Sequence, residues 1–417
     1  MPLHRLAILS VHTSPLAPMG GKKTGGMNVY IREFAQEAAR RGIQVDIFTR
    51  RSDVNEPKID AGLGENIRVI YLEAGPVAPL PPDEIFPYLS EFTSRLMAFA
   101  MLQADHYDFV YSHYWLSGWV AQKLKESWGT PFVQMFHTLG QMKQRILSHE
   151  TTLPDQRIQT ETEVMQWADK LVAATPAEYM QMLWLYRADR RKIEIIPPGV
   201  NIERFHPVDE ATNQQHIGPV GKNPYLLFVG RIERLKAVDS ILHALAILQN
   251  NDPHLLDDLR FLVVGGDPQD ATDTEMMTLQ QLALSLGVAD RVCFVGARDQ
   301  HQLPTIYANA LAALMPSDYE SFGMAALEAM ASGTPVIASR VGGLAYLVRD
   351  GETGYLVPVR EPQAIAASIA DLLSDTQKRK EMGRRAAEVA QEYAWGRIVD
   401  RLLTIFAGIQ ARQTART

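Results

Sequence analysis

The sequence predicts an α/β protein of two doubly wound, Rossmann-like domains. Two features of the pattern carry this prediction. Short apolar runs alternate with helix-length segments along the chain, and a turn-rich stretch interrupts the series once before a second series begins. The length of 417 residues agrees with it, because domains of about 150 residues allow two or three in a chain of this size.

The first series holds six expected strands. Their apolar runs are continuous, which is typical of strands buried on both faces of a parallel sheet. The runs are Leu6–Leu9, Val45–Phe48, Phe109–Tyr111, Phe132–Phe136, Lys170–Ala174 and Ile193–Ile196. The turn cluster Pro197–Gly199 and the polar stretch Pro207–Asn223 then break the pattern, so a domain boundary is expected near residue 205.

The second series repeats the alternation and ends in helices. Its runs are Leu226–Val229, Phe261–Val264, Val292–Val295, Ala312–Met315, Val336–Ala338 and Tyr355–Val357. From Glu361 onward the Ala and Leu spacing is helical to the end of the chain. The expected organisation is an N-terminal domain over residues 1–205, a C-terminal domain over 206–390 and a final helix over 391–417. Ligands of such folds bind at the carboxyl edges of the sheets, so we expect the binding site in a cleft between the two domains.

Composition and charge narrow the class of function. Lys and Arg number 41 against 48 Asp and Glu, and the net charge of −7 gives no overall attraction to nucleic acid or to an acidic membrane. No run of about 18 apolar residues appears, so no transmembrane segment is expected. The single cysteine, Cys293, excludes an intramolecular disulfide and indicates a reducing compartment, so a cytoplasmic location is expected.

The loop after the first expected strand runs from Ser14 to Met27 and is rich in glycine, with Gly25 and Gly26 near its end, and a helical pattern starts at Asn28. Glycines at a helix start let backbone N–H groups approach an anion, and the helix dipole adds partial positive charge. The loop has neither the Gly-x-Gly-x-x-Gly pattern nor that of a P-loop. By itself it is also compatible with a flexible turn.

Two cations follow the run Leu226–Val229, which is expected to be a strand. Arg231 and Lys236 would stand at the carboxyl edge of the second sheet, where they could hold a diphosphate, the first bidentately and the second as a point charge. Cations in a surface loop are also often just solvated.

The most informative loop follows the expected strand Ala312–Met315. Glu320 and Glu328 are eight residues apart, and at about 1.5 Å of rise per helical residue their carboxylates would be roughly 12 Å apart. Between them, Ser321, Phe322 and Gly323 would present free N–H groups at a helix start. This order matches a sugar hydroxyl, a diphosphate and a ribose hydroxyl. The alternative is that neither carboxylate binds a ligand. Glu320 would then only interact favourably with the helix dipole, and Glu328 would lie on a solvated helix face.

His137 ends the run Phe132–Phe136, where a neutral imidazole could contact a donor hydroxyl or the reacting centre. A structural histidine is the alternative. Lys143 and Arg157 follow in the chain and could bind a phosphate on an acceptor. No Asp-x-Asp pair occurs in the sequence, so the short carboxylate cluster that often holds Mg²⁺ or Mn²⁺ against a diphosphate is missing, and no metal or other cofactor is expected.

Four features, in this order and spacing, resemble the retaining glycosyltransferases of family 4, which have the two-domain GT-B fold. These are Gly25-Gly26, His137, the Gly230-Arg231 and Lys236 loop, and the pair Glu320 and Glu328. The resemblance runs from about Leu6 to Trp395. It also implies that the last helix, around Tyr393 to Phe406, packs back on the first domain.

The resemblance implies roles on the donor side. Arg231 and Lys236 would bind the diphosphate of a nucleotide sugar, Glu328 its ribose and Glu320 its hexose. Ser321, Phe322 and Gly323 would line the same site, and Gly25 and Gly26 would approach the diphosphate from the first domain. His137 would contact the sugar near its anomeric centre. With His137, Arg231, Lys236 and Glu320 as the catalytic set, transfer would be metal-independent and would retain configuration by front-face attack, through positioning and electrostatics.

On the acceptor side, the resemblance implies Asn28, Tyr114, Thr138, Lys143 and Arg157 as lining residues. The segments around Tyr114, Thr138 and Arg157 are similar to the sucrose-phosphate synthase subgroup, whereas Gly25 to Tyr30 is more similar to the mycothiol-pathway subgroup. Both subgroups use phosphorylated acceptors. The expected partners are therefore a UDP-sugar donor, most simply UDP-glucose, and a phosphorylated sugar or polyol, with fructose 6-phosphate first.

Three alternatives stay open. One is transfer from UDP-GlcNAc to an inositol phosphate, and another is a nucleotide-sugar epimerase of the same fold. A carbohydrate-binding module without turnover is a third. One departure bears on the acceptor: Asp83-Glu84 stand where the family usually places a lysine for the acceptor phosphate, and carboxylates would repel that group.

Overall fold

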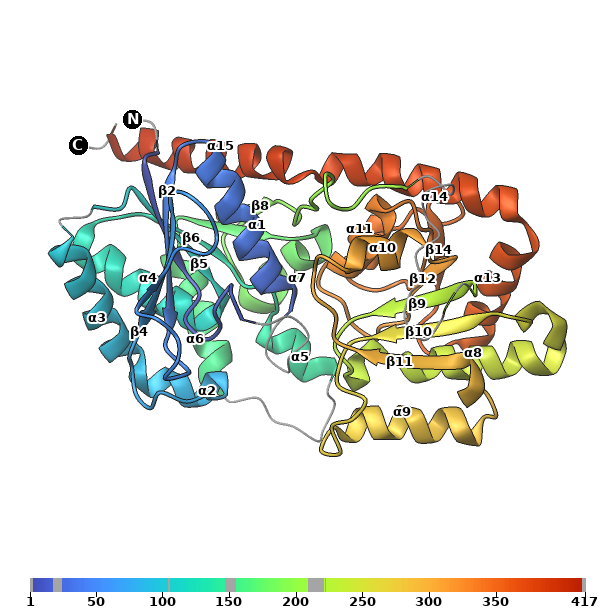
Figure 1. Ribbon diagram of the computed structural model, residues 1–417. Coiled ribbons are helices and arrows are strands. Elements are labelled where there is room, and N and C mark those ends of the chain that lie inside the picture. The colour runs from blue at the N-terminus through green and yellow to red at the C-terminus, as the bar shows by residue number, and fades with distance from the viewer. Residues whose placement is uncertain are drawn as a thin grey trace. The chain divides into compact units, whose positions relative to one another are not determined.

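The computed structural model describes residues 3–17, 25–103, 106–146, 155–208, 221 and 223–414. The chain forms two compact units, each with its own sheet (Figure 1). The first comprises Met1–Ala17, Gly26–Pro197 and Trp395–Thr417, and the second includes Pro198–Ala394. The chain leaves the first unit between Pro197 and Pro198, ahead of the expected boundary at 205, and returns to it at Trp395.

The first unit contains an eight-stranded sheet within its described residues, in the order β3-β4-β2-β1-β5-β6-β7-β8, and only β3 is antiparallel to its neighbour. The strands are β1 Arg5–Leu9, β2 Gln44–Arg50, β3 Ile59–Asp60, β4 Ile67–Leu72, β5 Phe109–His113, β6 Phe132–Met135, β7 Lys170–Ala173 and β8 Ile193–Ile195. All six strands expected here are present, but the two-residue β3 and the longer β4 were not anticipated. The Ile-Arg-Val-Ile-Tyr-Leu sequence of β4 is apolar and β-branched, so the signal for β4 was in the sequence.

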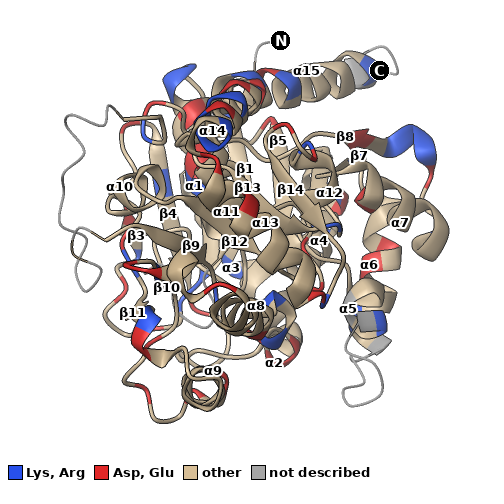
Figure 2. Cartoon of the chain, turned by 90° about the vertical axis from the view of Figure 1, so that its right-hand side faces the viewer, with Lys and Arg blue, Asp and Glu red and all other residues tan. Residues whose placement is uncertain are grey.

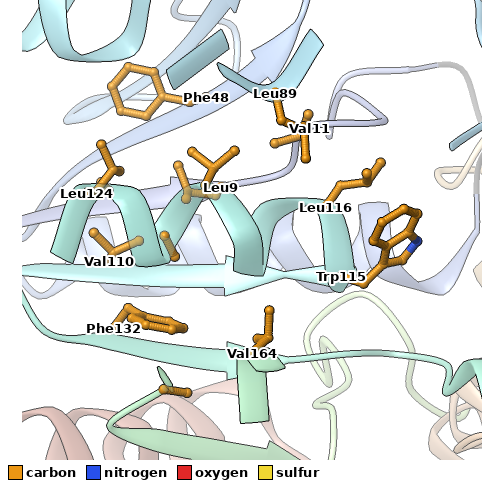
Figure 3. Close-up of a cluster of buried hydrophobic side chains, with 14 of the residues drawn as sticks. Leu9, Val11, Phe48, Leu89, Val110, Trp115, Leu116, Leu124, Phe132 and Val164 are labelled. Carbon is orange, nitrogen blue, oxygen red and sulfur yellow. The ribbon is translucent and has the colours of Figure 1, made fainter. Parts of the chain in front are cut away.

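Helices cover both faces of this sheet. They are α1 Gly26–Arg40, α2 Pro82–Ile85, α3 Leu89–Leu102, α4 Tyr114–Trp128, α5 Gly140–Ile146, α6 Asp155–Trp167, α7 Pro176–Tyr186 and α15 Trp395–Thr414. Figure 3 shows part of the core, where Phe48 of β2 and Val110 of β5 are buried with Leu116 and Leu124 of α4. Burial of such side chains stabilises the unit by about 1.5–3 kcal/mol each relative to exposure.

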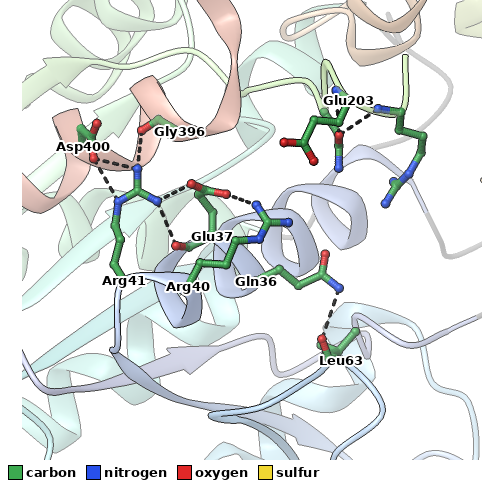
Figure 4. Close-up of polar contacts among 10 residues, drawn as sticks. Gln36, Glu37, Arg40, Arg41, Leu63, Glu203, Gly396 and Asp400 are labelled. Atoms are coloured by element: carbon green, nitrogen blue, oxygen red, sulfur yellow. Dashed lines mark hydrogen bonds and ion pairs between the residues drawn. The ribbon is translucent and has the colours of Figure 1, made fainter. Parts of the chain in front are cut away.

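The last helix, α15, belongs to the first unit although it follows the second in sequence, and it lies beside α1. The rings of Phe406 and Phe109 stack with centroids 5.0 Å apart. The guanidinium of Arg41 donates to Oδ1 of Asp400 at 2.8 Å and to the carbonyl of Gly396 at 3.0 Å (Figure 4). Aromatic burial and a charged pair thus hold both ends of the chain in one unit.

The described part of the second unit contains a six-stranded parallel sheet in the order β11-β10-β9-β12-β13-β14. The strands are β9 Tyr225–Val229, β10 Arg260–Val264, β11 Val292–Gly296, β12 Ala312–Met315, β13 Val336–Ser339 and β14 Gly354–Val357. The helices are α8 Val238–Asn251, α9 Thr274–Ser285, α10 Leu303–Ala308, α11 Met324–Ala331, α12 Leu344–Leu347, α13 Pro362–Ser374 and α14 Thr376–Ala390. Cations and carboxylates alternate on the exposed face of α14, as in the ion pairs of Arg384 with Glu381 and Glu388 (Figure 2).

Each sheet has one point at which the strand order reverses. In the second unit it lies between β9 and β12, and in the first between β1 and β5. Ligands of open parallel sheets bind at such points, because the loops that leave neighbouring strands there run apart. These two edges are where the candidate residues must be sought. None of the described helices combines the length and the apolar character that crossing a membrane needs.

Candidate active site

The second unit brings two predicted loops together at its switch point. One loop follows β9 and contains the short 3₁₀ turn Arg234–Lys236, and the other follows β12 and leads into α11. The backbone N–H of Asp318, in the second loop, donates to the carbonyl of Leu235 in the first at 2.9 Å. This hydrogen bond joins the two loops through the main chain. The loops lie close together because β9 and β12 are hydrogen-bonded neighbours.

This arrangement pairs two predicted catalytic residues. The ammonium Nζ of Lys236 lies 2.5 Å from Oε2 of Glu320, and about a fifth of each side chain is exposed. Arg231 instead forms an ion pair with Glu233 at 2.5 Å in its own loop, and 43% of its side chain is exposed. Lys236 is thus fixed against a carboxylate, whereas Arg231 stands more freely in solvent.

Glycines behind the β12 loop hold Glu320 from the other side. The N–H of Gly343 donates to the carbonyl of Glu320 at 3.0 Å. A Cβ atom on Gly342 would lie 1.8 Å from the same oxygen, so only glycine fits there. This contact was not anticipated from the sequence, although the two adjacent glycines shortly after β13 were a visible signal.

The predicted anion site at the helix start is built differently from the sequence expectation. Helix α11 begins only at Met324, and Gly323 precedes it with a left-handed φ of 107°. The estimate of roughly 12 Å between Glu320 and Glu328 assumed a continuous helix and does not apply, because the segment from Glu320 to Gly323 is a loop. No described residue accepts a hydrogen bond from the backbone N–H of residues 321–323, which precede α11, so these donors stay available to a ligand.

Glu328 lies inside the second unit, not on a solvated helix face. Only 7% of the residue is exposed, and its Oε2 accepts a hydrogen bond from the Tyr307 hydroxyl at 3.1 Å. Burial raises the pKa of that hydroxyl, and the neighbouring carboxylate raises it further. Tyr307 therefore stays a donor and orients Glu328. The ribose contact remains a prediction.

In the first unit, two histidines form a pair at the ends of β5 and β6. Nδ1 of His113 lies 2.9 Å from Nε2 of His137. His137 has a left-handed φ of 63°, an uncommon conformation for a residue with a side chain. Burial, together with the neighbouring His12, lowers the pKa of His137 to about 3. The imidazole is thus neutral at physiological pH and can exchange hydrogen bonds, but it carries no charge to a diphosphate.

Three predicted acceptor residues meet around a buried ion pair. Nε of Arg157 donates to Oε1 of Glu161 at 2.8 Å, and Nη2 donates to the carbonyl of Thr138 at 3.0 Å. Glu161 also accepts from the N–H of Gly140 at 2.9 Å and from the Tyr186 hydroxyl. None of the described residues accepts a hydrogen bond from Nη1 of Arg157. Glu161 and Thr138 therefore hold the guanidinium through Nε and Nη2 and leave Nη1, with its two N–H donors, without a described acceptor.

Tyr114 covers this ion pair. The guanidinium of Arg157 lies 5.0 Å from the centre of the Tyr114 ring, within cation–π range. Tyr114 has a left-handed φ of 73°, like His137 on the next strand. Burial raises the pKa of its hydroxyl, Arg157 opposes this, and the carboxylates of Glu161 and Asp83 add to it. Asp83, exposed in the first turn of α2, thus acts electrostatically on this cluster.

The start of α1 holds the remaining predicted residues of the first unit. Gly26 is its first residue and Gly25 precedes it directly. Asn28 is buried, and its Nδ2 donates to Oγ1 of Thr13 at 2.8 Å and to the carbonyl of Ser14 at 2.6 Å. That amide group therefore fixes the loop after β1. A direct acceptor contact by Asn28 remains a prediction.

Some expected features lie outside the described residues. They include most of the glycine-rich loop, residues 18–24, and the side chain of Lys143, whose backbone is part of α5. Within the described ranges, no group of three or more His, Cys, Asp or Glu side chains could hold a metal ion. Cys293 is a free, half-buried thiol.

Comparison with known proteins assigns the family. The sequence model "Glycosyltransferase Family 4" matches residues 24–204, and "Glycosyl transferases group 1" matches residues 209–389. A D-inositol 3-phosphate glycosyltransferase of Acidothermus cellulolyticus is 39% identical over 416 residues, which cover 99% of this chain and 92% of the relative. The chain belongs to the family 4 glycosyltransferases of GT-B fold.

Two further similarities of this family 4 glycosyltransferase bear on its subgroup. A D-inositol 3-phosphate glycosyltransferase 2 of Catenulispora acidiphila is 41% identical, and the match covers 94% of this chain and 92% of the relative. The solved structure of a sucrose-phosphate synthase from Thermosynechococcus elongatus is 32% identical with a TM-score of 0.88, covering 98% of this chain and all of that one. The predicted fold and family are confirmed.

Several residues of the glycosyltransferase site were not identified as such from the sequence. They are His113, Glu161, Tyr186, Asp318, Gly342 and Arg360. Glu161 lies one helical turn from Arg157 on α6, a spacing that was visible in the sequence. The others act on a predicted residue or its loop through a partner distant in the chain. Local patterns carry no information on such pairs, since strand order decides them.

Proposed function

We propose that this glycosyltransferase moves a hexose from a UDP-sugar to a phosphorylated polyol and retains the anomeric configuration. The observation that carries the donor half is the pair of Lys236 and Glu320 beside the free N–H groups at the start of α11. A cation, a carboxylate and a helix N-terminus at one sheet edge fit a diphosphate and a sugar hydroxyl. Arg231, half-exposed in the same loop, would add a second cation.

The acceptor half rests on Arg157. Its guanidinium donates to Glu161 and to the carbonyl of Thr138, and Nη1 stays available to donate to an anionic ligand. Tyr114 and Thr138 supply hydroxyl groups beside it. A phosphate on Nη1 would orient a polyol against the donor sugar.

An inositol phosphate is the first acceptor that we propose. The relatives named as D-inositol 3-phosphate glycosyltransferases are 39% and 41% identical, and they cover nearly the whole chain. Fructose 6-phosphate, the first acceptor expected from the sequence, is the second candidate. It is supported by the likeness to a sucrose-phosphate synthase at 32% identity.

For the chemistry, we propose front-face attack without a metal ion. Both motif carboxylates are engaged, Glu320 by Lys236 and Glu328 by Tyr307, so neither stands free as a nucleophile. The acceptor hydroxyl would approach the face from which the diphosphate leaves, and a phosphate oxygen would take its proton. The cations and the N–H groups at the start of α11 would stabilise the charge of the leaving group. His137, neutral, would orient the sugar by hydrogen bonding.

An acceptor screen tests this proposal. The enzyme is incubated with UDP-glucose or UDP-GlcNAc and with inositol 1-phosphate, inositol 3-phosphate or fructose 6-phosphate, and UDP release is followed with and without EDTA. We expect UDP only when an acceptor is present, at rates that EDTA does not change. Sugar epimerisation without acceptor would indicate an epimerase, and loss of activity in EDTA would contradict the metal-free mechanism.

A further inference from the structure

We propose that Arg360 is a positioning residue that clamps the two donor loops of the second unit together. It stands in the turn between β14 and α13, remote in sequence from both loops. The link from this clamp to catalysis rests on the proposed function, whereas the clamp itself does not.

One guanidinium group donates to four acceptor atoms on three residues. Nε and Nη2 of Arg360 donate to Oδ1 and Oδ2 of Asp318 at 2.7 and 2.5 Å, a bidentate pair. Nη1 donates to Oδ2 of Asp239 at 2.6 Å, and Nη2 also reaches the carbonyl of Arg234 at 3.2 Å. All three partners therefore share one planar group.

The partners of Arg360 belong to the elements that carry the donor residues. Asp318 is two residues before Glu320, and Arg234 is two residues before Lys236. Asp239 lies in the first turn of α8, the helix that follows Lys236. The side chain therefore bridges the β9 loop and the β12 loop next to the ion pair of Lys236 and Glu320, and it ties both to the start of α8.

The backbone of Arg360 supports a specific role. Its φ of 58° is left-handed, a conformation that glycine adopts readily and that costs other residues energy. The ion pairs offset that cost only while the guanidinium is bound. Glycine tolerates this φ, so replacement by glycine removes the side chain without adding backbone strain.

An exposed ion pair ordinarily adds little to stability, and about 38% of the Arg360 side chain is exposed. Removing it should therefore leave global unfolding almost unchanged. Ligand affinity is more sensitive, since it depends on the position of Lys236 and Glu320. A misplacement of about 1 Å lowers enzymatic rates by as much as a hundredfold.

The test compares R360G, R360K and D318N with the control R384A, which removes an exposed arginine that is also bound to two carboxylates in this unit. Hydrogen exchange of residues 230–237 and 316–323 is measured in the free protein, together with Tm and UDP affinity by calorimetry. R360G should raise exchange in both segments and weaken UDP about tenfold with Tm nearly unchanged. R360K should retain part of the affinity, and R360G combined with D318N should be no worse than R360G.

The outcomes separate the clamp from the proposed function. Unchanged exchange in both segments of R360G would overturn the clamp. Raised exchange with unchanged UDP affinity would overturn its link to the donor site. A wild-type protein that does not bind UDP would count against the proposed function, while exchange would still decide the clamp. R384A should match the wild type in every measurement.

Discussion

Nζ of Lys236 lies 2.5 Å from Oε2 of Glu320, across 84 positions of the chain. The contact exists because β9 and β12, which precede the two loops, pair side by side. This contact gives the second unit a fixed cation beside a helix N-terminus.

Replacing Lys236 by alanine should lower the transfer rate by about two to four orders of magnitude, since a point charge on the leaving diphosphate is lost and Glu320 is left unpaired. The measurement is UDP release at saturating acceptor, with Tm as the test of folding. K378A is the matched control, because Lys378 also binds a carboxylate, Asp371, at 2.8 Å on the surface of this unit. A turnover rate of K236A close to that of the wild type would contradict the role of Lys236 in stabilising the leaving diphosphate.

Changes at Arg157 should affect the affinity for the acceptor but not the affinity for the donor. The variant R157K keeps the charge but cannot bind Glu161, Thr138 and a phosphate with one planar group, so we expect the acceptor KM to rise about tenfold or more. The donor KM should stay unchanged. R191K, at an exposed arginine paired with Asp189, should alter neither value. A change in donor KM alone would show that Arg157 acts elsewhere.

Asp83 should weaken the binding of phosphorylated acceptors. Its carboxylate acts on the Tyr114 hydroxyl beside Arg157, so D83K replaces repulsion by attraction. We expect the KM of a phosphorylated acceptor to fall about three- to tenfold at low salt, and the gain to shrink as salt screens the charge. E84K, at the exposed neighbouring carboxylate, should have a smaller effect. Equal effects of the two variants would argue for general attraction instead.

Glu178 should make stability depend on pH. Its pKa is raised to about 7, chiefly by burial and also by the nearby Glu161, against the opposing effect of the hydrogen bond from the N–H of Ala174. The folded protein thus binds more protons than the unfolded chain from about pH 4.5 to 7, and stability is lost as pH rises through that window. E178Q removes this loss.

The measurement is urea unfolding of the wild type and of E178Q at pH 4.5 and pH 8. Relative to the wild type, E178Q should gain about 2–3 kcal/mol between the two values, since one pKa unit corresponds to about 1.4 kcal/mol. Burial of His113 and His137 lowers their pKa values and destabilises the fold as pH falls below about 6.5, but it does so in both proteins and cancels. A difference that does not grow with pH would contradict a buried neutral carboxyl group.

Much of the fold could be predicted because its signals are local. Continuous apolar runs marked every strand that was expected, and even the omitted β4 carries such a run. Glycines before α1 and before α11 marked helix starts correctly. The assumption that a continuous helix joins Glu320 to Glu328 was wrong, since α11 begins only at Met324, after Gly323.

The sequence by itself determined which residues can form strands and helices and which loops carry cations, carboxylates and glycines. Only the tertiary structure decided that Lys236 meets Glu320, that His113 contacts His137 and that Arg360 joins two loops. The physical reason is that secondary structure follows from the periodicity of neighbouring residues, whereas these pairs follow from strand order. Strand order is set by which apolar faces the whole chain can bury together.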